Sequence, residues 1–399
     1  MDVESLLLNK EIQQFIKEHI QTDTAKLMLQ AAKYPKWPFA QIMEQIQARQ
    51  KAADKLPQLC SQAAILFPAS LSIEQCSSEQ TAKYKASIVR ESDSLADLTG
   101  GFGIDTLAFA THIAKVYHIE QNERLSSIAA HNFSILTLTN ITCIAQEGIN
   151  WLKHQNQIFD SIYIDPARRD QHNRKMVSLA DCAPNILSHL PLLLKKSKQI
   201  LIKTSPLLDI HQTIQSLEGV AEIHIVAVNN ECKEVLYLIK PDYQSPATIK
   251  AINIKKDGTL EEFAFTIPTE QALSIPLSLP LKYLYEPNVA ILKAGAFKSI
   301  AKLYGLYKLH NNTHLYTSDT LLMNFPGRIF DYQYALKVDS KEVSALFPNK
   351  QALLIVRNFP MSTDDLLKKL KIKQGGDQYL LATTLLHNKH TLLFCKRIV

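Results

Sequence analysis

The chain has 399 residues and a formal net charge of +6. This length exceeds that of most single domains, so two or more domains are expected, and the mild basicity permits a polyanionic partner without requiring one. The six cysteines show no C-x-x-C spacing, which argues against a zinc site and a disulfide framework. Because the N-terminus carries no signal-peptide pattern and no run of about 18 apolar residues occurs, we expect a cytoplasmic protein without membrane segments.

Residues 1–75 are predicted to form a helical domain. Apolar residues recur at helical spacing from Val3 to about Leu59, and prolines on either side of Trp37 interrupt the pattern. The sequence SSEQ at 77–80 has the spacing of a capping box. A helix is therefore expected to begin there and to run to about Arg90.

Residues 76–242 alternate between strand-like and helical segments. The strand-like runs are separated by segments of helical length and period; they are 94–98, 115–119, 141–145, 161–164 and 199–203. This alternation predicts an α/β domain in which helices cover both faces of a parallel sheet.

The end of this region predicts a reversal of chain direction. Two further strand-like runs, 221–228 and 234–239, are separated by 229–233, whereas a parallel crossover needs about a dozen residues, so the two must pair antiparallel. A mostly parallel, seven-stranded sheet with a reversed last strand is the outline of the class I methyltransferase fold. An NAD-type Rossmann domain ends with parallel strands instead.

The composition changes beyond Pro241. A β-hairpin is expected around Asp257-Gly258. The run 285–305 is interpreted as one helix that its last residue, a glycine, terminates. From about Lys341 the pattern predicts helix, strand, helix, strand and strand, so the C-terminal part is expected to be α+β.

The stretch ADLTGGFGIDTLAFA at 96–110 leads from a strand through a glycine-rich turn into a helix. Gly101 and Gly103 let the backbone approach a ligand, and the helix start offers unpaired N–H groups, which suits a dinucleotide or S-adenosylmethionine. Asp97 would repel a pyrophosphate but attract the ammonium group of S-adenosylmethionine, directly or through water. Thr106 also replaces the third glycine of a dinucleotide fingerprint, so both observations favour S-adenosylmethionine.

Acidic residues follow the next two strands. Glu120 stands nineteen residues after Gly101, where a carboxylate can accept hydrogen bonds from ribose hydroxyls, although this spacing suits NAD equally well. Glu147 follows the third strand, where it could accept a hydrogen bond from the adenine amino group. A surface acid at a strand end is the alternative interpretation for both residues.

The fourth strand is followed by the sequence DPARRD at 165–170. Ligands bind at the carboxyl ends of parallel strands, so Asp165 and Pro166 are expected to face the reacting methyl group. Methylation of a planar amine depends mainly on positioning, and the Asp165 carboxylate and the Pro166 carbonyl can accept hydrogen bonds from its N–H groups.

Basic residues crowd the loop behind this acid, where a phosphate backbone would pass; they are Arg168, Arg169, Arg174 and Lys175. A solvated loop whose arginines pair with Asp165 and Asp170 is the alternative interpretation.

Together these motifs resemble the class I S-adenosylmethionine-dependent methyltransferases. The glycine loop with its preceding acid, the acid after the second strand and the Asp165-Pro166 pair carry the resemblance. Members that act on exocyclic amines often carry Asp or Asn, then Pro-Pro, then an aromatic residue after the fourth strand. This chain departs from that pattern at Ala167 and Arg168; an arginine plane can stack on a base or pair with phosphate.

More narrowly, the chain resembles a bacterial family of THUMP-like-domain methyltransferases through the segments EQCSSEQTAKYKA, DLTGGFGID, DPARR, KTSPLLD, YEPNVAILKAGAF and LYTSD. The resemblance implies a helical domain at 1–75, a methyltransferase domain at 76–242, a β-hairpin and ferredoxin-like segment at 243–325, and a THUMP-like domain at 326–399. It also implies that the THUMP-like domain binds RNA.

The leading hypothesis is an S-adenosylmethionine-dependent methyltransferase that acts on an exocyclic base amine of rRNA or tRNA. The catalytic residues would be Asp165 and Pro166, the substrate contacts would be the four basic residues above, and no metal is expected. The cofactor contacts would be Asp97, Thr99, Gly101, Phe102, Gly103, Glu120, Gln121, Glu147 and Asp165. Methylation of a protein or small molecule, and a non-catalytic RNA-binding protein with a vestigial fold, remain open, as does the oligomeric state.

Two further patterns bear on the substrate. Methylation of pyrimidine C5 needs a cysteine nucleophile after the fifth strand, where this chain has KTSP at 203–206. Cys182, the other candidate thiol, is expected to lie in a helix and out of reach. The segment 282–308 interleaves lysines with aromatic residues, as single-stranded nucleic-acid sites do, although many of its rings fall where core residues belong.

Overall fold

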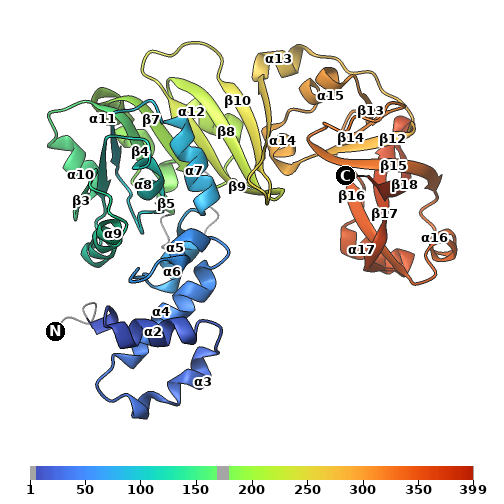
Figure 1. The fold of residues 1–399 in the computed structure, drawn as a ribbon. Helices are drawn as coiled ribbons and strands as arrows, with labels where there is room; N and C mark the ends of the chain where they lie inside the picture. The colour runs from blue at the N-terminus through green and yellow to red at the C-terminus, as the bar shows by residue number, and fades with distance from the viewer. Residues whose placement is uncertain (1–5, 169–178, 399) are drawn as a thin grey trace. The chain divides into compact units, whose positions relative to one another are not determined.

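The structure of the chain is a computed structural model that describes residues 6–168 and 179–398 (Figure 1). The chain divides into two compact units, Met1–Ala221 with Val235–Gln244 and Glu222–Glu234 with Ser245–Val399. The predicted α/β class is confirmed: the first unit contains a mostly parallel sheet, and the second contains a mostly antiparallel one.

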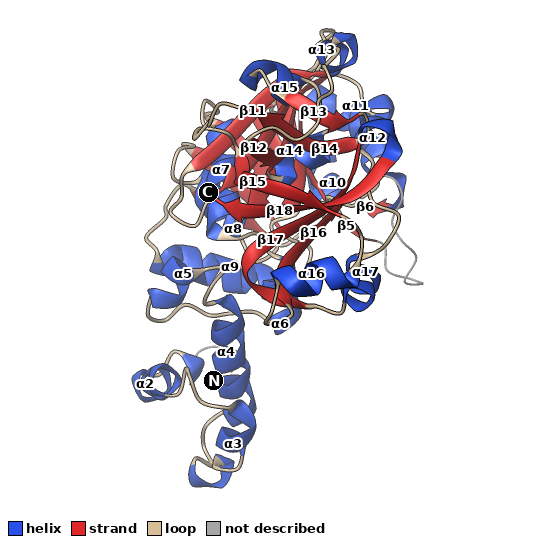
Figure 2. Ribbon diagram, turned by 90° about the vertical axis from the view of Figure 1, so that its right-hand side faces the viewer, coloured by secondary structure: helices blue, strands red, loops and turns tan. Residues whose placement is uncertain are grey.

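The N-terminal part of the first unit is built of short helices (Figure 2). They are α2 (Lys10–Glu18), α3 (Thr24–Met28), the 3₁₀ turn η1 (Ala31–Lys33), α4 (Phe39–Ala52), α5 (Pro57–Ser61) and α6 (Ser70–Gln75). Arg49 of α4 is buried and donates hydrogen bonds to the carbonyls of Cys60 and Ile65. Its guanidinium also lies 4.9 Å over the ring of Phe67, so this one side chain ties α4 to the segment that follows α5.

Helix α7 spans Glu79–Ile88, and its N-cap is Ser78, whose hydroxyl accepts a hydrogen bond from the N–H of Thr81 at 3.2 Å. The prediction of a capping box beginning at Ser77 is therefore wrong by one residue. The reason is a tertiary contact, because the Ser77 hydroxyl donates to Asp105 Oδ2 at 2.8 Å.

The sheet has nine strands and not the seven predicted, because β10 and β11 continue it beyond β8. The other seven follow one another in the order β3-β2-β1-β4-β7-β9-β8. Their bounds are Ser94–Asp97 (β1), Lys115–Ile119 (β2), Ile141–Ile144 (β3), Phe159–Ile164 (β4), Ser197–Thr204 (β7), Val220–Val228 (β8) and Glu231–Ile239 (β9). The first five in this order are parallel, and β9 runs antiparallel to β7. The predicted parallel sheet with a reversed strand is confirmed.

A tight turn joins β8 to β9. Its two central residues, Asn229 and Asn230, have φ of 50° and 63°. Positive φ at both positions defines the type I′ turn, whose twist matches that of the flanking strands. The predicted hairpin is present, but its connection has two residues because β9 begins at Glu231, before the apolar run that marked it in the sequence.

Helices connect the parallel strands: α8 (Ile104–Phe109), α9 (Glu123–Ile135), α10 (Gly148–Lys153), α11 (Ile186–Lys196) and α12 (Ile210–Ser216). The two shortest strands, β5 (Ala167–Arg168) and β6 (Cys182–Ala183), pair antiparallel after β4.

The second unit contains the predicted hairpin around Asp257-Gly258, formed by β10 (Thr248–Ile254) and β11 (Leu260–Thr266). Helix α13 (Ile267–Ala272) follows it, and a further sheet has the strand order β13-β14-β12-β15-β18-β17-β16. The bounds are Tyr283–Pro287 (β12), Tyr307–His310 (β13), Thr313–Ser318 (β14), Gly327–Leu336 (β15), Gln351–Arg357 (β16), Lys373–Leu385 (β17) and Lys389–Arg397 (β18).

The prediction of one helix over 285–305 is wrong. Its first residues belong to β12, and the rest forms two helices, α14 (Val289–Ala294) and α15 (Ser299–Tyr304). The break is at Gly295, which adopts a left-handed φ of 80° and ends α14. Gly305 ends α15 in the same way, as predicted.

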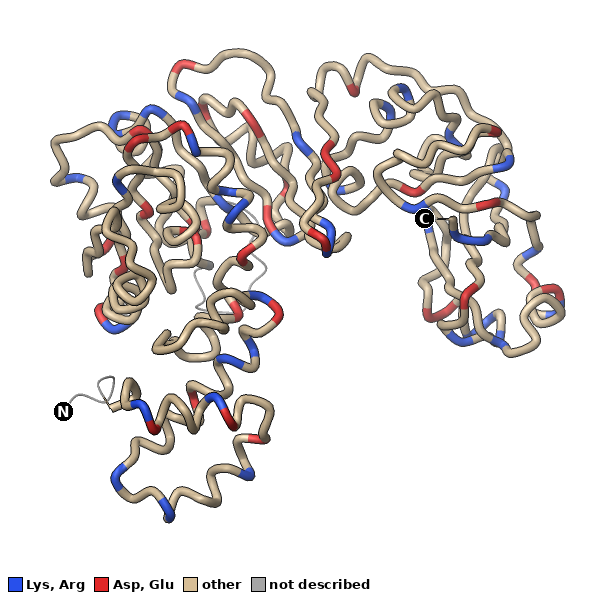
Figure 3. The backbone as a smooth tube through the Cα atoms, in the orientation of Figure 1, with Lys and Arg blue, Asp and Glu red and all other residues tan. Residues whose placement is uncertain are grey.

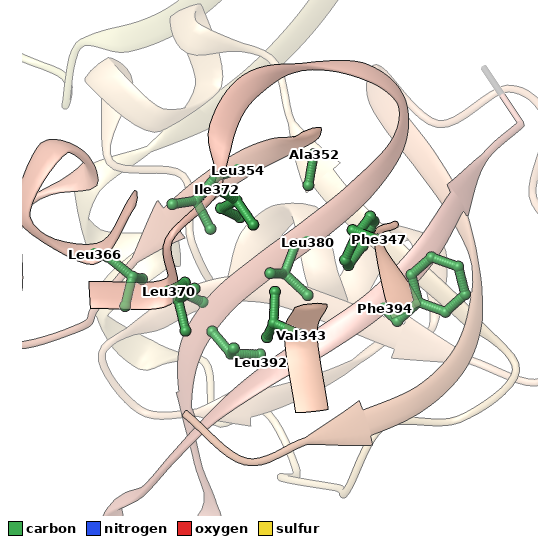
Figure 4. Packing of buried hydrophobic residues seen from close by; sticks show 11 residues of the cluster. Val343, Phe347, Ala352, Leu354, Leu366, Leu370, Ile372, Leu380, Leu392 and Phe394 are labelled. Atoms are coloured by element: carbon green, nitrogen blue, oxygen red, sulfur yellow. The ribbon is translucent and has the colours of Figure 1, made fainter. Parts of the chain in front are cut away.

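Helices α16 (Ser340–Leu346) and α17 (Thr363–Leu370) supply side chains to a closed core in the C-terminal part of the second unit. Figure 4 shows Val343 of α16, Phe347 just after that helix, and Leu366 and Leu370 of α17 gathered with Leu380 of β17. All five are buried. The predicted order of helix, strand, helix, strand and strand from Lys341 is observed here.

Glu286 of β12 is buried in the same unit, with 1 % of its side chain exposed. Arg328 of β15 and Arg357 of β16 both pair with its carboxylate, at 2.6 and 2.8 Å. A buried carboxylate is tolerated only when it is paired, and here its partners come from two other strands. These two ion pairs thus join β12 to β15 and to β16.

Candidate active site

The carboxyl ends of β1, β2, β4 and β7 lie at one edge of the sheet because these strands are parallel. Two hydrogen bonds join the loops that leave this edge. The N–H of Gly101 donates to Glu120 Oε2 at 2.9 Å, and the N–H of Asp165 donates to Thr99 Oγ1 at 2.7 Å. The loops after β1, β2 and β4 therefore form one continuous candidate site.

Asp97 is almost fully buried, with 1 % of its surface exposed. One carboxylate oxygen accepts a hydrogen bond from the N–H of Thr99 at 3.1 Å, and the other accepts one from the Thr106 hydroxyl at 2.6 Å. Burial is the main reason that the pKa of Asp97 rises to about 7. Asp97 therefore holds the glycine loop from inside the protein, where its burial keeps the carboxylate from direct contact with a ligand.

Thr106 links Asp97 to a buried histidine. Its hydroxyl lies 3.0 Å from Nδ1 of His118, which is fully buried, and burial lowers the pKa of His118 to about 4. The neutral ring lies against Gly100, where a Cβ would come within 2.3 Å of it. In the sequence Thr106 stood out only as the residue in place of a third glycine, because its partners lie on two other elements.

The glycines of the loop differ in their surroundings. Gly103 has a φ of +86°, and a Cβ there would lie 2.5 Å from the ring of Phe133. Gly101 has a φ of +56°, and a Cβ there would meet nothing nearer than a carbonyl oxygen at 3.8 Å. Open space beside Gly101 leaves its backbone accessible to a ligand. Phe102 between them is buried against Phe67, with ring centroids 5.7 Å apart.

Replacing Gly103 by alanine is expected to lower cofactor affinity at least about tenfold, because Phe133 blocks the added methyl group and the loop must shift. Calorimetric titration with S-adenosylmethionine measures the effect. Gly258→Ala is the matched control, since Gly258 has a φ of +85°, a Cβ added there would meet nothing within 4 Å, and the residue lies in the second unit. Equal affinity in the two variants would contradict a role for the loop in cofactor binding.

Glu120 uses both carboxylate oxygens locally, since Oε1 accepts a hydrogen bond from the N–H of Asn122 at 2.8 Å while Oε2 accepts from Gly101. Each oxygen has a second lone pair, so the carboxylate can still accept a hydrogen bond from a ligand hydroxyl. Gln121 is exposed beside it. The predicted cofactor contacts after β2 thus lie next to the glycine loop.

Glu147 caps helix α10, because its carboxylate accepts hydrogen bonds from the N–H groups of Ile149 and Asn150 at 3.1 and 2.7 Å. A Cβ at Gly148 would lie 2.2 Å from the carbonyl oxygen of Leu98, so the start of α10 packs directly on the glycine loop. An open hollow of about 620 Å³ lies beside the cap; its lining residues are Gln146, Glu147, Asn150, Trp151, His154 and Gln155.

Asp165 is half-buried after β4, and Pro166 behind it is buried. Asp165 Oδ2 forms an ion pair with Lys203 Nζ at 2.5 Å. Its other oxygen, Oδ1, has no hydrogen-bond partner within 6–168 and 179–398. In the sequence, Lys203 was noted only because no cysteine nucleophile stands there. Its pairing with Asp165 was not predictable, because it depends on the register of β4 and β7.

Asp105, in the first turn of α8, is the centre of a buried polar cluster that the sequence did not reveal. Lys85 of α7 pairs with it at 3.2 Å, and the hydroxyls of Ser77 and Tyr163 each donate to it at 2.8 Å. Burial alone would raise the pKa of Asp105, but the charges of Lys85 and Lys203 and these hydrogen bonds hold it below its ordinary value of 3.8. Helix α7 therefore contacts the candidate site through Lys85, and the residue Ser77 just before its N-cap does so as well.

The expectation that Cys182 lies in a helix is wrong, since it belongs to β6 and pairs with Arg168 of β5. The two residues are brought together by the antiparallel strand pair after β4, and the Cys182 side chain is buried. Three of the predicted substrate contacts, Arg169, Arg174 and Lys175, lie outside the described residues.

The aromatic residues of 282–308 differ in exposure: Tyr285 is fully buried, three are partly buried, and Tyr307 is exposed to 41 %. The partly buried ones are Tyr283, Phe297 and Tyr304. The Tyr304 ring packs against Phe325, and the buried Lys308 donates to the carbonyl of Asn311 at 2.6 Å. The segment therefore contributes to the core as well as to the surface, and its alternation of lysines and rings does not by itself mark a stacking surface.

Within the described part of the chain, no three His, Cys, Asp or Glu side chains are grouped so that they could hold a metal ion. Over the same residues, none of the helices has the length and apolarity needed to cross a membrane.

Two family models match the second unit. Residues 283–326 match a ferredoxin-like domain, and residues 327–397 match a THUMP domain-like family. No curated protein matches the chain.

A solved structure matches the whole chain. It is described as a "putative methyltransferase" from Porphyromonas gingivalis W83, and it is 33% identical to this chain with a TM-score of 0.88. The match covers 100% of both chains.

Two further solved structures match a smaller part. An rRNA methylase from Streptococcus thermophilus is 16% identical, with a TM-score of 0.30, over 42% of this chain and 95% of its own. A "putative methyltransferase" from Streptococcus mutans, in complex with SAH, is 11% identical, with a TM-score of 0.30, over 40% of this chain and 96% of its own. Likenesses at this level carry no argument about function.

Proposed function

Because the chain belongs to a bacterial family of THUMP-like methyltransferases, we propose that it transfers a methyl group from S-adenosylmethionine to an exocyclic base amine of RNA. One observation carries the proposal. The backbone N–H of Asp165 donates to Thr99 Oγ1 at 2.7 Å, which joins the loop that carries Asp165 to the glycine loop. A methyltransferase needs its donor site and its acceptor site next to each other.

The residues around the glycine loop suit the proposed cofactor, whose sulfonium group supplies the methyl group. Gly101 leaves open space beside its backbone, and Glu120 lies within hydrogen-bond distance of it, which places an acceptor for ribose hydroxyls beside the loop. The proposed contacts are Thr99, Gly101, Phe102, Gly103, Glu120, Gln121 and Glu147, and Asp165 is assigned to the acceptor. We assign Asp97 an indirect role, since its carboxylate is buried and holds Thr99 and Thr106.

In this proposal Asp165 and Pro166 orient the acceptor. The unengaged Oδ1 of Asp165 and the carbonyl of Pro166 would accept hydrogen bonds from the two N–H groups of a planar amine. The nitrogen lone pair is then directed toward the glycine loop. Positioning of this kind supplies a large part of the rate enhancement of a transfer between two bound groups.

The cofactor assignment is tested by calorimetry of the full chain with S-adenosylmethionine and, separately, with NAD. We expect S-adenosylmethionine to bind and NAD to bind at least about 10²-fold more weakly, because a pyrophosphate would lie near the acidic loops. Binding of NAD without binding of S-adenosylmethionine would refute the proposal.

The THUMP domain-like match is the main support for an RNA substrate. Exposed lysines at the end of α17 and the start of β17 offer phosphate contacts (Figure 3); they are Lys368, Lys369, Lys371 and Lys373. Affinity for total bacterial RNA is expected to fall steeply between about 50 and 200 mM salt. Affinity that does not respond to salt would favour methylation of a protein or a small molecule instead.

A non-catalytic RNA-binding protein is the remaining alternative. It predicts salt-sensitive RNA binding without transfer of labelled methyl groups from S-adenosylmethionine to RNA. Mass spectrometry of nucleosides from a strain that lacks the gene would identify the modified base as the one that disappears.

A further inference from the structure

Lys203 lies at the carboxyl end of β7, next to the strand that delivers Asp165. β4 and β7 are parallel, with Ile164 opposite Ile202, so the residues that follow these two positions are neighbours at the edge of the sheet. Their side chains form an ion pair at 2.5 Å, in which 13 % of the Lys203 side chain and 33 % of the Asp165 side chain are exposed. The pair is therefore partly shielded from water. A shielded ion pair keeps its two side chains in one orientation better than a fully exposed pair does.

A second carboxylate, that of Asp105, interacts electrostatically with Lys203. The charge of Lys203 lowers the pKa of Asp105, and Lys85, Ser77 and Tyr163 hold Asp105 in place. Lys85 is itself fully buried. Lys203 therefore pairs with Asp165 and also interacts electrostatically with Asp105.

The pairing has a consequence for amine methylation. A free carboxylate rotates and presents either oxygen, whereas Asp165 has Oδ2 engaged by Lys203 and its backbone N–H engaged by Thr99. One oxygen, Oδ1, is left to accept a hydrogen bond from the substrate. The ammonium charge is also balanced by the carboxylate of Asp165, so the pair places no net positive charge beside a sulfonium donor.

We propose that Lys203 is a positioning residue for methyl transfer, which holds Asp165 so that Oδ1 alone faces the acceptor amine. This inference rests on the proposed function. It predicts that Lys203 affects turnover and leaves cofactor binding unchanged. It also predicts that arginine can replace lysine, since a guanidinium can make the same pair with a carboxylate.

The test compares Lys203→Met and Lys203→Arg with the wild-type chain. The assay measures transfer of tritiated methyl groups from S-adenosylmethionine to total RNA of a strain that lacks the gene, together with calorimetric affinity for S-adenosylmethionine. We expect Lys203→Met to lower kcat about 10- to 100-fold, with the cofactor Kd within about threefold of wild type, since misplacement by about 1 Å costs rates of this order. Lys203→Arg is expected to recover kcat to within about fivefold of wild type.

Lys198→Met is the matched control. Lys198 lies on the same strand and pairs with Asp160 of β4 at 2.7 Å, but at the opposite end of both strands. This variant is expected to transfer methyl groups at the wild-type rate. Thermal unfolding of all three variants separates loss of turnover from loss of fold, and Lys203→Arg keeps the test valid if Lys203→Met does not fold.

The outcomes are distinguishable. No transfer by the wild-type chain would refute the proposed function itself. Normal wild-type transfer with an unchanged kcat in Lys203→Met would refute only the role of Lys203. Equal losses of kcat and of cofactor affinity would place Lys203 in the cofactor site and overturn the inference, and failure of Lys203→Arg to recover turnover would do the same.

Discussion

Replacing Asp165 by alanine is expected to lower methyl transfer about 10²- to 10⁴-fold while the Kd for S-adenosylmethionine stays within about threefold of wild type. The Asp165 carboxylate lies at the end of β4, and its only described side-chain partner is Lys203. Its removal takes away the acceptor for the amine hydrogen and the ion-pair partner of Lys203. Initial rates with labelled cofactor and calorimetry on the same protein measure the two quantities.

The conservative variant separates positioning from charge. Asp165→Asn keeps an oxygen that accepts a hydrogen bond, so it is expected to retain more transfer than Asp165→Ala. The backbone N–H of residue 165 donates to Thr99 in each case, which preserves the connection to the glycine loop. A parallel loss of cofactor affinity and of transfer in Asp165→Ala would instead make Asp165 part of the cofactor pocket.

Replacing Lys85 by methionine is expected to destabilise the first unit by about 3–5 kcal/mol, because it leaves the buried Asp105 without its nearest cation. The exposed fractions of the two side chains are 0 % for Lys85 and 12 % for Asp105, and their charged atoms lie 3.2 Å apart. Ser77 would also lose the hydrogen bond that Lys85 donates at 3.0 Å. Urea unfolding measured by circular dichroism gives the free energy of unfolding.

The same variant has a predictable pH dependence. The pKa of Asp105 lies below its ordinary value of 3.8, so this group stabilises the fold above that pH and its contribution is lost as the pH falls through the lowered pKa. Lys85→Met removes part of that contribution. The difference in unfolding free energy between wild type and variant is therefore expected to shrink as the pH falls below 3.8. A difference that stays constant would mean that the loss comes from packing.

An exposed pair in the same part of the chain provides the control. Lys51 and Glu74 are 2.6 Å apart, with 48 % and 58 % of their side chains exposed. Lys51→Met is expected to leave the free energy of unfolding almost unchanged, because water and salt screen an exposed pair. The double variant Lys85→Met/Asp105→Leu is expected to be more stable than Lys85→Met alone, since no unpaired charge is left inside the protein.

The parallel sheet and the reversal of its last strand were predictable from the sequence. A parallel connection needs a crossover, and the short segment between 228 and 234 left no room for one. The reversal of β9 therefore followed from the length of this connection alone. The glycine loop was predictable for a similar reason: a turn with left-handed residues between a strand and a helix is a local property of the chain.

The predictions of helices and strands were wrong where a residue has its partner on another element. Ser77 does not cap α7 because its hydroxyl donates to Asp105 instead. Cys182 lies in a strand because β6 pairs with β5, in which Arg168 is opposite it. Gly295 divides a run of helical residues whose periodicity alone predicted one helix.

The sequence by itself determined which residue types stand at the carboxyl ends of the strands, because parallel strands separated by helices bring those ends to one edge. Only the tertiary structure decided what each residue does there. Asp97 is turned inward to Thr99 and Thr106, and Asp165 is joined to Lys203, because side-chain direction depends on partners that register and packing bring together. Such partners lie on different elements, and no spacing along the chain records their distance.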